Sequence, residues 1–269
     1  MRRSASSLYA EIINVGNELL DGRTVNTNLT WIGERMGELG FIVKRAMIVR
    51  DDLKEISSAV KDALRRKPRW IIISGGLGPT HDDMTLEGVA KALGKRTEVN
   101  LEALQMIREH YEKLVEKGLA SRVELTKERI KMAKLPKGAK PLKNNVGTAP
   151  GVLIKFRGVK IACLPGVPSE LKDIFQSHLL PMLEQDSRGA GILRKRITVK
   201  GILESSLAPI IEETMKKFKG VYIKSSPRGF EGDESVIDVD FIFEKPVKGR
   251  EKILEDAIRF LMEKTREGG

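Results

Sequence analysis

Short apolar segments alternate with amphipathic segments in the first half of the chain, and this alternation limits the possible folds more than any other feature of the sequence. The apolar segments are rich in β-branched residues, as in Ile71-Ile72-Ile73, and therefore predict strands. Strands that alternate with helices form βαβ units, in which the strands are parallel and the helices cover both faces. The sequence therefore predicts an α/β fold, a three-layer α/β/α domain with a mostly parallel sheet. We expect strands at residues 8–15, 41–49 and 69–74, and helices at residues 24–40, 52–67 and 85–93.

The middle of the chain is more polar. Two helices rich in Lys and Glu are expected at residues 101–117 and 123–133, and their composition places them outside the core, where they offer a surface to a partner. The segment 135–151 contains Pro and Gly and predicts an ordered loop. The sequence then predicts a hairpin around Arg157-Gly158 and a strand that turns into a helix, at residues 152–156, 159–164 and 164–175.

The composition changes after Gln185, and we expect a domain boundary there, between residues 1–185 and 186–269. The segment 186–192 predicts a linker or surface loop. The order of the elements beyond it is β-α-β-β-α, which predicts a small α+β domain with its helices on one face. Its elements are expected at residues 193–200, 205–218, 221–225, 236–243 and 250–264.

The composition excludes several classes of protein. A chain of 269 residues with 41% hydrophobic residues can bury a large core, and no apolar stretch is long enough for a membrane span. Cys163 is the only cysteine, so no internal disulfide and no Cys-rich zinc site can form, and we expect a cytoplasmic protein with Cys163 buried. The net charge of +11 permits nucleic-acid binding, but acids interrupt the cations and aromatic residues amount to only 5%. A mixed, charge-rich surface is the alternative that we favour.

A glycine-rich turn, Gly75-Gly76-Leu77-Gly78, follows the apolar strand at 69–74. Glycines at the end of a parallel strand let the backbone approach a ligand, and the exposed N–H groups suit a phosphate. Asp82 and Asp83 follow the turn, and carboxylates beside a phosphate repel it unless a cation lies between them. The turn therefore predicts a phosphate held next to a divalent cation. The alternative is that Asp83 only caps the helix that begins near Thr85.

Other turns are expected at the same edge of the sheet, because the carboxyl ends of parallel strands lie together. Glu18 and Asn28 follow the first strand, and Asp51 follows the second, where Asp52 is expected to cap the next helix. Small-residue turns at 144–151 and 164–170 complete the set. Ordinary turn chemistry explains each of these segments equally well.

These segments, in this order, resemble the amino-terminal domain of the competence- and damage-inducible CinA family, which belongs to the MoaB/Mog-like molybdopterin-binding superfamily. The resemblance covers about residues 8 to 180, and the tail is similar to the small second domain of the same proteins. It implies that the chain ends before the deamidase domain of full-length CinA and lacks that activity. The segments are GNELLDG, NTN, RDD, GGLGPTHDDMT, NNVGTAPG and LPGVPSE.

The resemblance implies a metal-dependent nucleotide pyrophosphatase that hydrolyses ADP-ribose or a related dinucleotide, with Mg, Mn or Co as the divalent cation. The alternative is a protein that binds molybdopterin or a nucleotide without turnover. Asn17 stands where many CinA-like sequences have Asp, so metal affinity is lower here if that Asp is a ligand. We also expect a homo-oligomer, a dimer or a trimer.

The predicted site residues fall into two groups. Those expected to act in catalysis and to hold the metal are Asp82, Asp83 and Glu18. Those expected to contact the phosphate or the rest of the ligand are Gly75, Gly76, Leu77, Gly78, Thr80, Asn28, Thr85, Gly147, Pro165 and Gly166.

Overall fold

A computed structural model describes residues 8–119, 121–187, 193–243 and 249–267. The chain divides into two compact units between Asp186 and Ser187, and each unit is described by itself. None of the helices in the described ranges is both long enough and apolar enough to span a membrane.

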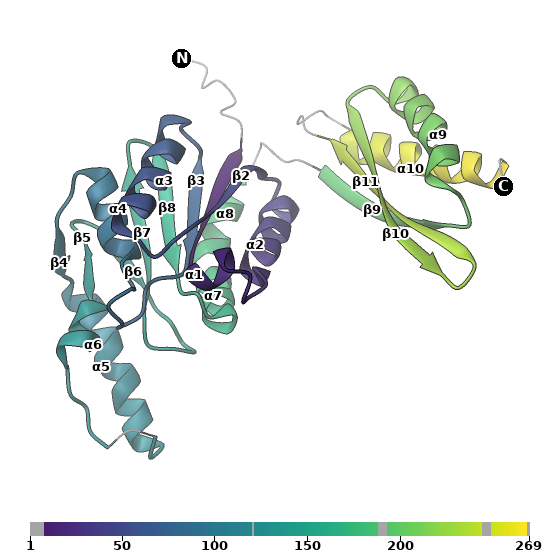
Figure 1. The fold of residues 1–269 in the computed structure, drawn as a ribbon. Helices are drawn as coiled ribbons and strands as arrows, with labels where there is room; N and C mark the ends of the chain where they lie inside the picture. Colours follow the sequence, from purple (N-terminus) through teal and green to yellow (C-terminus); the bar gives the residue numbers. More distant parts are fainter. Residues whose placement is uncertain (1–7, 120, 188–192, 244–248, 268–269) are drawn as a thin grey trace. The chain divides into compact units, whose positions relative to one another are not determined.

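The first unit is built on a six-stranded sheet with the strand order β2-β1-β3-β8-β7-β6 (Figure 1). The pairs β2–β1, β1–β3 and β3–β8 are parallel, whereas β7 runs antiparallel to both β8 and β6. A separate two-stranded sheet pairs β4 with β5. The strands are β1 Tyr9–Val15, β2 Ile42–Val49, β3 Trp70–Ser74, β4 Thr97–Val99, β5 Lys134–Pro136, β6 Lys140–Leu142, β7 Gly151–Phe156 and β8 Val159–Leu164.

Helices cover both faces of the six-stranded sheet, which confirms the predicted three-layer architecture (Figure 1). One face packs on α3 and α4 through fully buried residues such as Ile13, Ile73 and Val89. The other face lies under α2, α7 and α8, where Trp31 meets the ring of Phe175 edge-on at 5.1 Å. The helices are α1 Asn17–Leu20, α2 Thr27–Glu38, α3 Leu53–Arg65, α4 Thr85–Leu93, α5 Leu101–Glu116, α6 Lys127–Lys131, α7 Pro168–Ile174 and α8 Leu180–Ser187, with a π-helical segment, Phe175–Leu179, between the last two.

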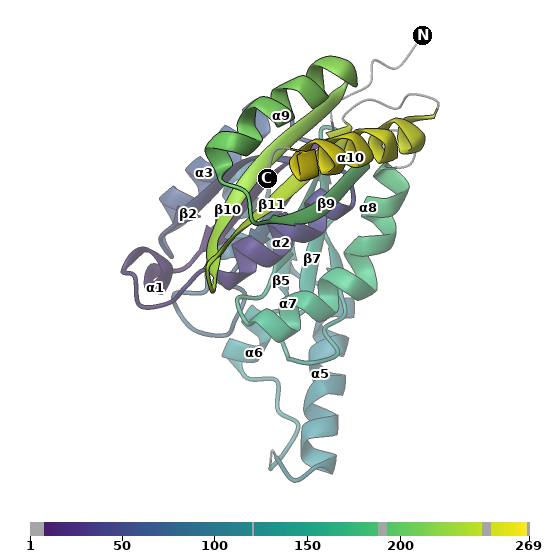
Figure 2. The ribbon, with the colours of Figure 1, turned by 90° about the vertical axis from the view of Figure 1, so that its right-hand side faces the viewer.

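The second unit is the predicted small α+β layer. Its sheet has the order β10-β11-β9 and is antiparallel throughout. Both helices pack on one face, where Leu207 of α9 and Leu254 of α10 are buried with Val239 and Phe241 (Figure 2). The elements are β9 Leu193–Lys200, α9 Glu204–Lys217, β10 Val221–Glu231, β11 Glu234–Phe243 and α10 Arg250–Glu267.

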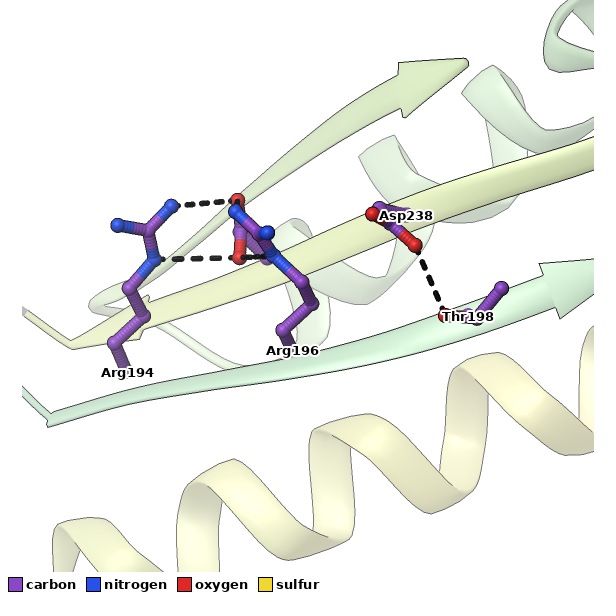
Figure 3. A network of polar contacts seen from close by, with 5 residues as sticks. Arg194, Arg196, Thr198 and Asp238 are labelled. Atoms are coloured by element: carbon purple, nitrogen blue, oxygen red, sulfur yellow. Dashed lines mark hydrogen bonds and ion pairs between the residues drawn. The ribbon is translucent and has the colours of Figure 1, made fainter. Parts of the chain in front are cut away.

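The opposite face of this sheet is charged. Arg194 and Arg196 of β9 both donate to the carboxylate of Asp240 on β11, over 2.7 to 3.2 Å (Figure 3). Asp240 is only 3% exposed, although it lies on the side away from the helices. The two long arginine side chains therefore cover the carboxylate that they neutralise.

Several predicted elements differ from the structure. The predicted helix at 123–133 is wrong except for the short α6, because the side chain of Thr126 accepts from Arg129 N and begins the helix there. The predicted loop at 135–151 contains part of β5 and all of β6, short strands that carry little periodicity. The sequence missed α1 and the continuation of α7 through the π-helical segment into α8. The predicted linker at 186–192 falls largely outside the described residues.

Candidate functional site

The carboxyl ends of β1, β3 and β8 meet at one edge of the sheet. Gly75 N–H, just beyond β3, donates to Leu164 O at 3.0 Å, and Gly16 N–H, just beyond β1, donates to Val49 O at 3.1 Å. Gly75 has φ 99°, and a Cβ at this position would stand 2.1 Å from Val15 O. Only glycine fits there, because both the backbone conformation and the available space exclude a side chain.

Thr85, the first residue of α4, holds the glycine loop in place. Its hydroxyl donates to Gly75 O at 2.8 Å, and its N–H donates to Gly76 O at 3.2 Å. A Cβ on Gly76 would stand 2.4 Å from the Thr85 hydroxyl oxygen. The loop is therefore pulled against the start of α4, and a side chain at Gly76 would push it away.

Two of the predicted ligand residues have buried side chains. Thr85 is completely buried and Leu77 is 4% exposed, so neither side chain faces a ligand. The Thr85 hydroxyl shapes the loop, and Leu77 belongs to the core between the sheet and α4. Any contact that these two residues make with a ligand is limited to the backbone.

Thr80 connects the two predicted catalytic aspartates. Thr80 N–H donates to Asp83 Oδ2 at 2.8 Å, and the Thr80 hydroxyl lies in hydrogen-bond contact with both Asp82 Oδ1 and Asp83 Oδ2. The bond from Thr80 lowers the pKa of Asp82. Asp83 does not cap α4, because its N-cap residue is Met84, so the capping alternative for Asp83 is wrong. The ammonium of Lys131 donates to Thr80 O and brings a cation to this loop.

Asp51 is a further carboxylate at this edge, and it lies against the glycine loop. Asn17 N–H donates to Asp51 Oδ2 at 2.8 Å, and a Cβ on Gly76 would stand 3.6 Å from Asp51 Oδ1. Burial raises the pKa of Asp51, and repulsion from three further acids raises it as well. These acids are Glu18, Asp82 and Asp83. The hydrogen bond from Asn17 N–H acts in the opposite direction and lowers the pKa.

The charges of three acids at this edge act on Asp51, but the four acids do not converge. Within the ranges that the structure describes, no group of three or more His, Cys, Asp or Glu side chains is arranged to hold a metal ion. The Glu18 side chain turns back toward Gly16, where a Cβ would stand 2.5 Å from Glu18 Oε1. A shared cation would therefore require movement of these side chains.

A cleft of about 90 Å³ opens next to the glycine loop, between the sheet edge and the chain that enters α2. Asn28 spans it, with its amide nitrogen donating to Gly166 O at 2.8 Å. Gly166 lies against Gly75, since a Cβ on Gly166 would stand 3.5 Å from Gly75 Cα. The cleft is lined by Val15, Glu18, Leu19, Thr24, Val25, Asn26, Thr27, Asn28, Ser74, Gly75, Gly166 and Pro168.

A buried polar pair lies below the edge, on the α2 side of the sheet. Asn14 Nδ2 donates to Ser74 Oγ at 2.6 Å, and Ser74 also lines the cleft. Asn14 is fully buried, and its Oδ1 has no hydrogen-bond partner among the described residues. Buried polar atoms are almost always paired, so Asn14 keeps an unused acceptor beside Ser74, one residue below the cleft surface.

Gly147 and Pro165 are also at the carboxyl edge, but both serve the packing. A Cβ on Gly147 would stand 2.1 Å from Glu170 Cδ, so glycine lets this loop approach the first turn of α7. Asn144 joins the two segments, accepting from Gly147 N at 2.7 Å and donating to Glu170 Oε2 at 2.6 Å. Burial raises the pKa of Glu170, and the bond from Asn144 opposes this. Pro165 is buried.

Two smaller predictions are confirmed. Asp52 is the N-cap of α3 and accepts from Lys54 N and Glu55 N at 2.7 and 3.0 Å. Cys163 is completely buried, and burial raises the pKa of its thiol to about 12. Neither residue takes part in the site.

A three-layer α/β domain with a glycine loop, a cleft and several carboxylates at the carboxyl edge of its parallel strands has the layout of a small-molecule-binding domain. The chain belongs to the family described as probable molybdopterin binding domain, which matches residues 11–185.

Similar proteins occur in archaea. A protein of Sulfurisphaera tokodaii is 44% identical over 86% of this chain and 84% of its own length. A protein of Pyrococcus horikoshii is 48% identical over 83% of this chain and 86% of its own length. The solved structure of the protein CinA from Thermoplasma acidophilum, of unknown function, is 41% identical, with a TM-score of 0.60 over 68% of this chain and 99% of that chain. The resemblance to the CinA family is therefore confirmed.

Proposed function

We propose that this protein is a metal-dependent nucleotide pyrophosphatase that hydrolyses ADP-ribose or a related dinucleotide. The observation that carries the proposal is the meeting of a glycine-rich loop and four carboxylates, three of which act on the fourth, at one sheet edge. A diphosphate needs backbone donors on one side and a neutralising cation on the other, and this edge offers donors and acids within one loop system.

The glycine loop would hold one phosphate of the substrate. The backbone of Gly76, Leu77 and Gly78 carries N–H groups next to the amino end of α4, where the helix dipole favours an anion. The ammonium of Lys131 lies at the same loop and lines a small depression with Gly76 and Gly78. These groups would bind the anion and orient its bridging oxygen.

The acids at the edge suit a divalent cation such as Mg, Mn or Co. Their oxygens are the ligands that such ions prefer. Burial raises the pKa of Asp51 and the charges of Glu18, Asp82 and Asp83 add to the rise, so a cation beside Asp51 would favour its charged form. Glu18, Asp82 and Asp83 would hold the ion, and Asp51 would join them from β2. When bound, such an ion lowers the pKa of a coordinated water and stabilises charge on phosphoryl oxygens.

Residues around the cleft would position the rest of the substrate. Asn28 is fixed by Gly166 O, which leaves its side-chain oxygen able to accept from a hydroxyl or amino group of the ligand. Thr80 orients Asp82 and Asp83 through its hydroxyl and would act on the substrate through them. The cleft next to the loop would receive a ribose or a ring.

Release of AMP from ADP-ribose, measured with Mg²⁺, Mn²⁺ and Co²⁺, tests the proposal. We expect Asp83→Ala to remove activity with all three ions. This change takes away a carboxylate and also removes the acceptor of the Thr80 N–H, which holds the loop in place. Asp62→Ala is the matched control, since Asp62 pairs with Arg65 on the surface of α3. Equal activity of Asp83→Ala and Asp62→Ala would reject the proposed role of the acids.

A protein that binds molybdopterin or a nucleotide without turnover is the second candidate. The family to which the chain belongs is described by molybdopterin binding, not by hydrolysis. Calorimetric titration with ADP-ribose, FAD and a pterin distinguishes the two candidates. Saturable binding without product in the presence of any of the three cations would favour the second one.

We also propose that the protein forms a homo-oligomer, a dimer or a trimer. Large apolar side chains are exposed at and beyond the ends of α5, with Leu101 79%, Leu119 73% and Val123 37% exposed. The length of α5 separates Leu101 from the other two, so each end of the helix carries its own exposed apolar side chains, which a partner subunit would cover. Light scattering coupled to size exclusion measures the state, and we expect Leu101→Glu combined with Leu119→Glu to shift it toward the monomer.

A further inference from the structure

A second cavity lies at the opposite edge of the first unit, at the amino ends of the parallel strands. Its volume is about 450 Å³, and Lys67 and Val159, which line it, lie just before β3 and at the start of β8. The glycine loop follows the other end of β3, so the length of that strand separates the two places. The volume falls in the range of about 300–1,000 Å³ that is typical of small-molecule sites.

The wall of this cavity is cationic and its floor is apolar. Four basic side chains line it, and no acid does: Lys61, Arg65, Lys67 and Arg157. Leu93, Val159 and the half-buried Phe156 supply apolar surface between them. Such a wall favours a ligand that carries negative charge at one end and a ring or another apolar group at the other.

Three of the four cations have no acidic partner within the described part of the chain. Arg65 pairs with Asp62 at 2.6 Å, whereas no ion pair joins Lys61, Lys67 or Arg157 to a described carboxylate. Arg157 also lies over the ring of Phe156, at 5.1 Å from its centroid. The positive charge of this cavity is therefore largely uncompensated.

The backbone at two of these cations is held in an unfavourable conformation. Lys67 has φ 52° and Arg157 has φ 47°, and they are the two non-glycine residues with positive φ in the described chain. Lys67 follows the end of α3, and Arg157 precedes Gly158 in the β7–β8 turn. Glycine or Asn is the usual residue at both kinds of position, because a long side chain costs free energy there.

Hydrogen bonds from side chains to the last carbonyl groups do not account for the cations at these helix ends. Lysine and arginine often lie at helix carboxyl ends because they can bond the last carbonyl groups. Here backbone groups already fill that role, since Lys67 N–H donates to Leu64 O at 3.0 Å and Gly94 N–H donates to Lys91 O at 3.3 Å. The basic side chains therefore remain available to a ligand.

We infer that this cavity is a second ligand site, for an organic phosphate that carries a ring, such as a nucleoside diphosphate. The phosphates would lie between Lys61, Lys67 and Arg157, and the ring would lie on the apolar floor near Phe156. The site is separate from the glycine loop and does not depend on the function proposed for that loop.

Calorimetric titration with ADP at low salt, without and with Mg²⁺, tests the inference. The informative variant is Lys67→Gly combined with Arg157→Gly, which removes two cations and relieves both positive-φ residues, so it is expected to fold. We expect this variant to lose one ADP site or to bind it at least ten-fold more weakly. The matched control is Lys113→Ala combined with Lys117→Ala, which removes the same charge from α5 and should bind ADP like the wild type.

The outcomes separate this site from the glycine loop. Two ADP sites in the wild type and one in the double-glycine variant support both the glycine-loop site and this cavity. One ADP site in the wild type and none in the variant support this cavity alone. Equal binding by the double-glycine variant and the α5 control overturns the inference. Inorganic pyrophosphate has the phosphates of ADP but no ring. If it binds as tightly as ADP, the inferred contact between the ring and the apolar floor is overturned.

Discussion

The carboxylate of Asp240 should be the largest single electrostatic contribution to the stability of the second unit. Burial opposes its charge, but hydrogen bonds from Arg196 and Arg194 outweigh burial and lower the pKa of Asp240 from 3.8 to about 2. A shift of one unit corresponds to about 1.4 kcal/mol, so the pair of arginines stabilises the charged form by roughly 2 kcal/mol. Asp240→Asn removes this term and should lower the free energy of unfolding by about that amount.

The arginines set the upper limit of the effect. Removal of one partner from a fully buried ion pair costs roughly 3–5 kcal/mol, because a charge stays buried without compensation. Here the side chains of Arg194 and Arg196 are 38% and 56% exposed, so water can solvate them when Asp240 is neutral. The loss should therefore stay near the value taken from the pKa.

The sign of the pH dependence follows from the lowered pKa. A carboxylate with a folded pKa below its unfolded value adds stability above the unfolded pKa, and that stability disappears as the pH falls through the folded pKa. The difference between the wild type and Asp240→Asn should be complete above about pH 5 and fall by about half near pH 3.

Hydrogen exchange measured by mass spectrometry gives a local readout of this change. A loss of about 2 kcal/mol should accelerate exchange in β11 roughly 30-fold and leave β1 of the first unit unchanged. Asp238→Asn is the control, because Asp238 lies two residues away on the same strand and accepts from the Thr198 hydroxyl at 2.9 Å. Equal exchange in the two variants at pH 7, or a difference that is as large at pH 3 as at pH 7, would refute the reasoning.

Three further predictions concern the glycine–carboxylate edge. Thr85→Val leaves the buried Gly75 carbonyl without its side-chain donor and should cost about 1–3 kcal/mol in thermal unfolding followed by tryptophan fluorescence; unchanged stability would show that the loop does not need this bond. Gly75→Ala should lower the free energy of unfolding several-fold more than Gly22→Ala in the same assay. Gly22 also has positive φ, at 70°, but nothing lies within 4 Å of a Cβ placed there. Similar losses in the two variants would mean that the contact with Val15 O relaxes easily. Asp51→Asn should stabilise the protein at pH 7, because the raised pKa of Asp51 makes its charge costly once the pH exceeds that pKa. The gain in stability should disappear in acid and shrink when Mg²⁺ is added. A variant that is less stable than the wild type at pH 7 would contradict this prediction.

The layers of the first unit could be predicted because they depend on periodicity. In apolar strands such as Trp70–Ser74 and in the amphipathic α4, the spacing of apolar residues indicates which side chains are buried. The helix α4 begins and ends where the sequence predicted. The short strands β5 and β6 could not be predicted, since three residues show no period, and the partner of β5, strand β4, is also distant in the chain. The π-helical segment at Phe175–Leu179 likewise has no sequence pattern of its own.

The site was predictable only in part, for a similar reason. The glycines and aspartates of residues 75–83 are neighbours in the sequence, so their shared chemistry is visible there. Lys131 reaches Thr80 O from 51 residues away, and nothing near Lys131 points to that contact. Asp51 was not among the predicted site residues, although its position just after β2, at the same sheet edge, could have indicated it. The buried hydroxyl of Thr85 depends on packing, which the sequence alone does not reveal.

The contact of Gly75 with Gly166 has a consequence for how such a protein can diversify. On the Gly75 side of this contact a substitution cannot reshape the cleft, because a Cβ there would stand 2.1 Å from Val15 O. New ligand preferences must then come from the rim, where Val25 is 82% exposed beside the cleft. A mutational library confined to residues 24–28 should therefore change which compounds bind while sparing the scaffold. An equally large library at Gly75 and Gly76 should yield mostly misfolded chains, because both have positive φ and no room for a Cβ.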